Sequence, residues 1–145
     1  MAKRGSKNMF VMSRRVEFMD TDMAGIVHFT SYFRYMETAE HELFRHLGLP
    51  AAAGGSNSCS GWPRVSCSFD FKKSLRFADT FEVHIGVTKI EKQSVTYEVK
   101  IVRNKTVFAH GHSVSVYCNI DKSGRMHVVD IPKNIAQKLN KFLVS

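Results

Sequence analysis

The chain has 145 residues, of which 43% are hydrophobic, and this length predicts a single domain over residues 1–145 with a core of its own. Its formal net charge of +8 favours anionic partners such as nucleic acid, anionic lipid or a phosphorylated small molecule. No stretch is apolar and long enough for a membrane span or a signal peptide, and the three cysteines lack C-x-x-C spacing, so we expect a cytoplasmic protein with reduced thiols.

A strand and a long helix are expected first along the chain. Residues 1–9 are expected to form a flexible N-terminus, and residues 10–18 the first strand. Apolar side chains recur at three- and four-residue steps over residues 30–47, which predicts a helix with a broad apolar face. Gly48 and Pro50 end this helix, and the small, polar residues 50–63 predict a long loop.

Four further strands are expected after this loop. Apolar residues alternate with a period of two in residues 65–71, 81–87 and 95–101, which is typical of half-buried antiparallel strands. A fourth run, residues 106–119, changes its apolar register at Gly111, which predicts a β-bulge. The following segment predicts a turn around Ser123 and Gly124 and then a short C-terminal helix that Pro132 opens.

This order of elements predicts an α+β fold. One long helix would cover one face of a five-stranded antiparallel sheet, and a short helix would close the chain. Neither a G-x-G-x-x-G motif nor a P-loop is present, so a standard nucleotide cradle is not expected to hold the anion.

Two segments carry a more specific pattern. They are VEFMDTDMAGIVHFTSYFRYMETAE, which begins at Val16, and PRVSCSFDFKKSLRFADTFEV, which begins at Pro63. Together they resemble the hotdog-fold acyl-CoA thioesterases of the 4-hydroxybenzoyl-CoA thioesterase family, where D-x-D-x-x-G-[IV]-V precedes an aromatic-rich helix start. The resemblance implies a sheet that wraps around the long helix, a dimer or homotetramer, and an active site between subunits.

The resemblance assigns the catalytic carboxylate to Asp22 and the oxyanion contact to the backbone N–H of Phe29. Asp22 would attack the thioester carbonyl to give a mixed anhydride, or act as general base on a water molecule. The sequence leaves both routes open. Without the resemblance, an aspartate before a helix is more simply read as a cap for the turn or for the helix.

Three neighbours of Asp22 receive separate interpretations. Asp20 has the same strand parity as Val16 and Phe18, so its side chain is expected to point inward and brace the loop. Gly25 is expected to supply a positive φ in a tight turn. His28 stands where several relatives carry an aromatic residue with histidine next; it either orients Asp22 or the attacking water, or is an ordinary loop histidine, and both interpretations stay open.

Other ionisable residues show weaker patterns. Glu37 and His41 lie four apart on the predicted helix and are most simply an ion pair, but Glu37 is a second candidate for the catalytic carboxylate because some hotdog thioesterases use a glutamate on the helix. His110 and His112 share a strand face without a nearby carboxylate to complete a metal site. We therefore predict no metal and no cofactor.

Basic residues are the predicted contact for coenzyme A. Lys72, Lys73 and Arg76 follow one strand and Lys92 flanks the next hairpin, so they are expected to gather at one rim where the phosphates would bind. A solvated basic surface explains any single one of them as well. RNA binding is the rival explanation of the charge, but the sequence has no stacking platform of aromatic residues among basic ones.

The sequence thus predicts an acyl-CoA thioesterase that releases a free acid and coenzyme A, with the acyl group left open. A non-catalytic hotdog module that binds acyl-CoA or acyl carrier protein is the main alternative, since it would keep the fold without needing Asp22. A hotdog dehydratase fits less well, because it would carry its histidine and acid on the helix in a different motif.

Overall fold

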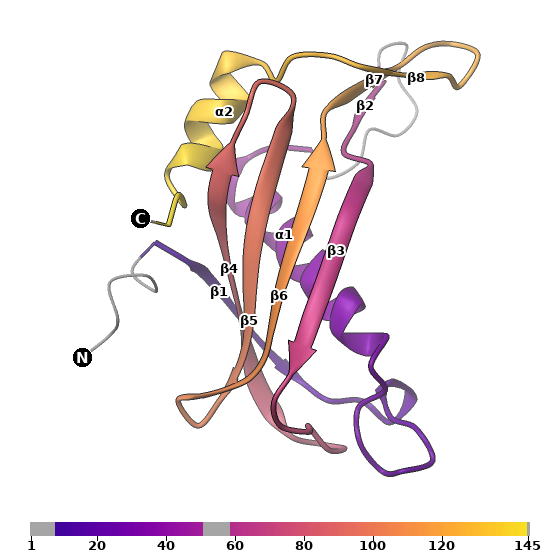
Figure 1. Cartoon of the computed structure of the whole chain (residues 1–145), viewed down its shortest axis with the longest axis vertical. Helices are drawn as coiled ribbons and strands as arrows, with labels where there is room; N and C mark the ends of the chain where they lie inside the picture. Colours follow the sequence, from indigo (N-terminus) through magenta and orange to yellow (C-terminus); the bar gives the residue numbers. More distant parts are fainter. Residues whose placement is uncertain (1–7, 51–58, 145) are drawn as a thin grey trace.

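The computed structural model describes residues 8–50 and 59–144, which form a five-stranded antiparallel sheet, a small three-stranded sheet and two α-helices (Figure 1). The strand order is β1-β4-β5-β6-β3 in the larger sheet and β2-β7-β8 in the smaller one. In chain order the elements are β1 (Phe10–Arg15), η2 (Phe18–Asp20), α1 (Ser31–Leu47), β2 (Cys59–Gly61), β3 (Arg64–Phe71), β4 (Thr80–Ile90), β5 (Ser94–Arg103), β6 (Thr106–Val116), β7 (Cys118–Ile120), β8 (Met126–Val128) and α2 (Lys133–Asn140).

The long helix α1 covers one face of the five-stranded sheet (Figure 1). On that face the side chains of β4 and β5 are at most 3% exposed: Phe81, Val83, Ile85, Val87, Val95, Tyr97, Val99 and Ile101. The core also takes in helix side chains that are at most 1% exposed, namely Tyr35, Met36, Ala39, Leu43 and Phe44. Burying each large apolar side chain contributes roughly 1.5–3 kcal/mol, so this layer holds the fold together. The predicted α+β arrangement is confirmed.

Both helices begin close to where the sequence predicts. Thr30 is the N-cap of α1, and Gly48 ends the helix with a φ of 71°, a left-handed conformation that glycine adopts without Cβ strain. Pro132 directly precedes α2. The second helix ends at Asn140 instead of residue 143, because the chain after it pairs with β4: the Val87 N–H donates to the Phe142 carbonyl at 2.8 Å.

The first strand is shorter than predicted. β1 ends at Arg15, and the 3-10 turn η2 follows. The Glu17 N–H donates to the Asp20 carboxylate at 3.0 Å, so a side-chain acceptor takes the place of a strand partner. Phe18 is 78% exposed. The prediction of a strand over residues 10–18 is therefore wrong for its last three residues.

β3 is an edge strand, and its predicted half-burial is wrong. Val65 is 60% exposed and Phe71 is 48% exposed, and Cys67 is also exposed. The helix lies mainly over β4 and β1, so it leaves much of β3 uncovered. Phe69 is the partly buried member of the alternation, with its ring centroid 5.1 Å from that of Phe33 on α1.

The bulge predicted at Gly111 is also wrong. Pairing with β5 runs without interruption through Gly111, and the irregularity lies beside Phe108 instead. The inward residues of β6 are small or polar, namely Ala109, Gly111, Ser113 and Ser115. A larger residue would not fit at Gly111, since a Cβ atom there would lie 2.7 Å from the Phe69 ring. The alternate positions, which include Val114 and Val116, face the other side of the sheet.

Part of the predicted loop over residues 50–63 forms a strand. Residues 51–58 lie outside the described residues, but β2 pairs with β7, and β7 pairs with β8. The strand predicted over residues 106–119 is accordingly split at Tyr117. The turn expected around Ser123 and Gly124 joins β7 to β8, with Gly124 at a φ of 86°.

The expected flexible N-terminus falls mostly on residues 1–7, which lie outside the described residues. Within the described part, Met9 is 6% exposed, and the Asn8 side-chain amide donates to the Leu143 carbonyl at 3.0 Å. The two ends of the described chain therefore meet beside β4.

Candidate active site

The segment between η2 and α1 forms a tight loop around Asp22. The Asp22 N–H donates to the Ile26 carbonyl at 2.9 Å, and the Gly25 N–H donates to the Asp22 carbonyl at 3.0 Å. Gly25 has a φ of 81°, which confirms the predicted positive φ. The half-buried Asp22 carboxylate accepts one hydrogen bond through Oδ1, from the Ala24 N–H at 2.9 Å. No hydrogen bond among the described residues engages Oδ2, which stays available for chemistry.

Asp20 braces this loop from inside, as predicted. Its side chain is buried, and its carboxylate accepts hydrogen bonds from the Tyr35 hydroxyl at 2.8 Å and from the Arg34 guanidinium at 3.2 Å. Burial, followed by the hydrogen bond to Asp20, raises the pKa of Tyr35 above its ordinary value, so the hydroxyl stays protonated and donates. This contact was not predicted, because Tyr35 belongs to the apolar stripe of the helix.

The backbone N–H of Phe29 lies just before the first turn of α1. The preceding His28 N–H donates to the Asp20 carbonyl at 2.8 Å, and the following Thr30 N–H donates to the His28 ring at 3.2 Å. Among the described residues, the Phe29 N–H has no hydrogen-bond acceptor. An unpaired N–H at a helix start is suited to receive negative charge from a ligand.

His28 contacts residues other than Asp22. Its Nδ1 atom lies 2.7 Å from the Thr30 hydroxyl, and its ring stacks on Phe29 with centroids 4.7 Å apart. No hydrogen bond joins His28 to Asp22 in the part of the chain that the structure describes. The geometry therefore places His28 as a support for the turn that carries Phe29.

Asp22 borders two hollows on the surface. One, of about 340 Å³, is lined by Asp22, Ile26, Val27, Phe29, Tyr32, Phe71, Lys72, Lys73 and Ser74. The other, of about 470 Å³, is lined by Phe18, Thr21, Asp22, Met23, Gly25 and Phe77. The first hollow combines a carboxylate, an aromatic wall and two ammonium groups, and the second is mostly apolar.

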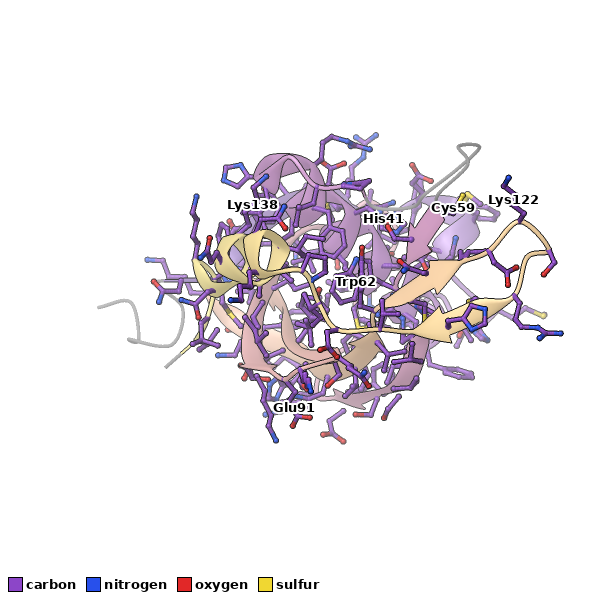
Figure 2. The ribbon with its side chains drawn as sticks, turned by 90° about the horizontal axis from the view of Figure 1, so that it is seen from above. His41, Cys59, Trp62, Glu91, Lys122 and Lys138 are labelled. Carbon is purple, nitrogen blue, oxygen red and sulfur yellow. The ribbon has the colours of Figure 1, made fainter. Side chains whose placement is uncertain are left out.

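Three of the four predicted phosphate contacts lie near Asp22. Lys72 and Lys73 line the first hollow, and Arg76 forms an isolated bridge with Ile26 in the Asp22 loop. Lys92 does not join them within the protomer. It lies in the β4–β5 turn next to Glu91, at the end of the molecule seen in Figure 2, and its ammonium group is 3.9 Å from Asp130. The prediction for Lys92 is wrong because β4 carries it to the far end of the sheet.

Glu37 lies away from both hollows. Its side chain is 58% exposed and lies 3.9 Å from the Arg64 guanidinium, so its partner is Arg64 and not the expected His41. Arg64 also donates to the buried Glu40 carboxylate at 2.8 Å. These helix carboxylates form a separate cluster at the start of β3.

Among the described residues, no group of three His, Cys, Asp or Glu side chains is placed to hold a metal ion. His110 lies 3.5 Å from Glu98, and the His112 ring lies beside that of His110. In the part of the chain that the structure describes, neither helix has the length and hydropathy that crossing a bilayer requires.

A family model described as the thioesterase-like superfamily matches residues 16–139, which is most of the chain. The chain belongs to the thioesterase-like superfamily. This membership confirms the predicted family and the class of thioester hydrolase. The matched residues include the whole Asp22 loop and both hollows.

Relatives of this thioesterase superfamily member carry more specific names. It is 30% identical over 108 residues to a 1,4-dihydroxy-2-naphthoyl-CoA hydrolase of Parasynechococcus marenigrum, covering 69% of this chain and 70% of the relative. It is 29% identical over 94 residues to a 4-hydroxybenzoyl-CoA thioesterase of a Pseudomonas species, covering 63% and 67%. The structure of a gentisyl-coenzyme A thioesterase superposes with a TM-score of 0.77 at 28% identity, covering 90% of this chain and 99% of that one.

Proposed function

We propose that the protein is a cytoplasmic acyl-CoA thioesterase that hydrolyses its substrate to a free acid and coenzyme A without a metal or cofactor. One observation carries this proposal: the Asp22 carboxylate and Phe29 line the same hollow as Lys72 and Lys73. A carboxylate, an unpaired N–H and a cationic rim are the groups that hydrolysis of a coenzyme A thioester needs.

Asp22 supplies the reacting carboxylate. Its Oδ2 atom either attacks the thioester carbonyl, giving a mixed anhydride that water then hydrolyses, or takes a proton from the attacking water. In both routes the carbonyl oxygen gains negative charge, and the Phe29 N–H donates to it. The thiolate of coenzyme A leaves and takes a proton from solvent.

Lys72, Lys73 and Arg76 are the proposed contacts for the coenzyme A phosphates. All three side chains are exposed, so they can reach a ligand whose nucleotide remains in solvent. The relatives named above act on aromatic acyl groups, and the wall of Phe29, Tyr32 and Phe71 is aromatic. An aromatic acyl-CoA is therefore the first substrate to test.

We also propose that the enzyme assembles as a dimer or tetramer. The outer edge of β3 has no strand partner among the described residues, and unpaired edge strands readily pair with a second copy.

The deciding experiment compares the parent with Asp22→Asn and Glu37→Gln on aromatic and aliphatic acyl-CoAs. Loss of the thioester absorbance is a better readout than a thiol reagent, because the Cys67 thiol is exposed. Asp22→Asn should lower kcat by at least about a hundredfold, the lower range for an acid-base group, while Glu37→Gln keeps the parent rate. The opposite pattern would assign the reaction to Glu37. Binding of acyl-CoA with no turnover by the parent would favour a non-catalytic binding module.

A further inference from the structure

We infer that Asp20 and Tyr35 are positioning residues that hold the Asp22 carboxylate and the Phe29 N–H in a fixed relation to each other. The inference rests on the proposed function of Asp22 and Phe29. Neither Asp20 nor Tyr35 lines either hollow, so both act through the loop and not on the substrate.

The anchor of this arrangement is the buried Asp20 carboxylate. Asp20 is 2% exposed and Tyr35 is 1% exposed. Oδ2 accepts from the Tyr35 hydroxyl at 2.8 Å and from the Glu17 N–H at 3.0 Å, and Oδ1 accepts from Arg34 at 3.2 Å. With both oxygens engaged, the carboxylate has one orientation, and hydrogen bonds to an ionised acceptor are strong ones.

Tyr35 is itself held firmly on the helix. Its ring packs against Phe81 of β4, with centroids 4.8 Å apart, and the Arg14 guanidinium lies 5.2 Å from the ring centroid. Because the sheet fixes the ring, the hydroxyl reaches Asp20 from a rigid support. The Tyr35 hydroxyl thereby ties the loop to both the helix and the sheet, whereas Arg34 and Ser31 tie it to the helix.

The backbone carbonyl of Asp20 sets the position of the proposed oxyanion donor. It accepts from the His28 N–H at 2.8 Å and from the Ser31 hydroxyl at 2.9 Å. These two donors stand on either side of Phe29 in the chain. The two contacts to Asp20 therefore hold the chain on both sides of Phe29, and the His28 carbonyl, which shares a peptide group with the Phe29 N–H, accepts from the Ser31 N–H at 2.9 Å.

Asp20 is also connected through Thr21 to Asp22, which carries the reacting carboxylate. Thr21, next to Asp20, donates through its N–H and its hydroxyl to the Phe18 carbonyl, at 3.1 and 2.7 Å. Thr21 also forms a bridge with Val27, and Asp22 follows it. Both reacting groups thus extend from the one residue that Tyr35 secures.

Tyr97 provides a matched control for Tyr35. It is another buried tyrosine, 0% exposed, and its hydroxyl has no hydrogen-bond partner among the described residues. Replacing either tyrosine by phenylalanine removes one buried hydroxyl and keeps the ring. Only Tyr35→Phe removes a contact to Asp20.

The test uses the full chain and measures kcat and KM for the best acyl-CoA, together with amide hydrogen exchange at His28. Tyr35→Phe should lower kcat by about tenfold, less than the roughly hundredfold that a 1 Å misplacement can produce, with KM within twofold. Exchange at His28 should become faster, because its acceptor loses its support. Tyr97→Phe should leave kcat and His28 exchange within about twofold of the parent, because the Tyr97 side chain makes no hydrogen bond to Asp20.

Two results would overturn the inference. One is an equal kcat in the two variants; the other is unchanged His28 exchange in Tyr35→Phe, which would leave Tyr35 a role in stability alone. Failure of the proposed function looks different: Asp22→Asn would retain the parent rate, while His28 exchange would still report whether Tyr35 holds the loop.

Discussion

Arg64 donates a hydrogen bond of 2.8 Å to the carboxylate of Glu40, whose side chain is only 6% exposed. Burial raises the pKa of Glu40, and the nearby Arg64 opposes that shift without cancelling it. When the pKa of an acid is higher in the folded state than in the unfolded state, the free energy of unfolding falls as the pH rises from the unfolded-state pKa through the folded-state pKa. Removal of Arg64 would raise the pKa of Glu40 further and enlarge this loss.

We therefore expect Arg64→Met to reduce the free energy of unfolding by about 3 kcal/mol at pH 8, the range for breaking a buried pair, and by clearly less at pH 5. Urea unfolding at the two pH values measures this difference. The matched control is Arg45→Met, which removes an exposed ion pair with Glu42 and should cost at most about 1 kcal/mol. An equal loss for Arg64→Met at both pH values would contradict the argument.

Gly111→Ala should destabilise the fold by about 2 kcal/mol, as overpacking a filled site does. The added Cβ atom would lie 2.7 Å from the Phe69 ring, which is itself packed against α1. Thermal unfolding against Gly61→Ala provides the comparison, because a Cβ on Gly61 would meet its nearest atom at 3.5 Å. Adding Phe69→Leu to Gly111→Ala should recover part of the loss, and no recovery would mean that the strain lies elsewhere.

Gly111 shows the limit of predicting the inward face of a strand from its apolar pattern. The period-two patterns in β4 and β5 predicted their inward faces correctly, because the inward side chains of both strands are buried in the core. In β6 the apolar residues Val114 and Val116 lie on the other face, and glycine and serine occupy the crowded side. An apolar pattern identifies the core-facing side of a strand only where the core has room for large side chains. At Gly111 the Phe69 ring leaves no room for one.

The candidate site was predictable to a similar degree. The motif around Asp22 identified the loop, the positive φ of Gly25 and the bracing role of Asp20. The Tyr35 contact was not visible, because the same residue type serves as a core aromatic and as a hydrogen-bond donor. Lys92 was misplaced since charge spacing along a chain does not tell which end of a strand a turn occupies.

Replacing Lys72 and Lys73 together by alanine should raise KM for acyl-CoA while sparing kcat. Added salt should do the same, because the Debye length falls from roughly 10 Å at 0.1 M to about 3 Å at 1 M. A short acyl thioester without the nucleotide should respond to neither change. The matched variant replaces Lys122 and Lys133, two exposed lysines in other parts of the molecule, and should behave as the parent. An equal response of both substrates would remove the lysines from the coenzyme A site.

Val65→Lys should weaken assembly. Val65 is 60% exposed on the edge strand β3, where a lysine would add charge to an already cationic chain. Val128→Lys on β8 is the control, since Val128 is 52% exposed but lies in the smaller sheet. Light scattering should give a dimeric or tetrameric mass for the parent and Val128→Lys, and a lower mass for Val65→Lys. A parent that is monomeric and fully active would exclude the proposed assembly.

The strand order also has a consequence for the time course of folding. β4, β5 and β6 follow one another and can form local hairpins, whereas the strand that β1 pairs with is the distant β4, which places Phe10 opposite Ile85. On the ribosome, β1 must therefore wait for more than half of the chain before its partner strand exists. Pairings this distant in sequence slow folding, so we expect the β4–β6 meander to gain hydrogen-exchange protection first during refolding, with β1 joining last.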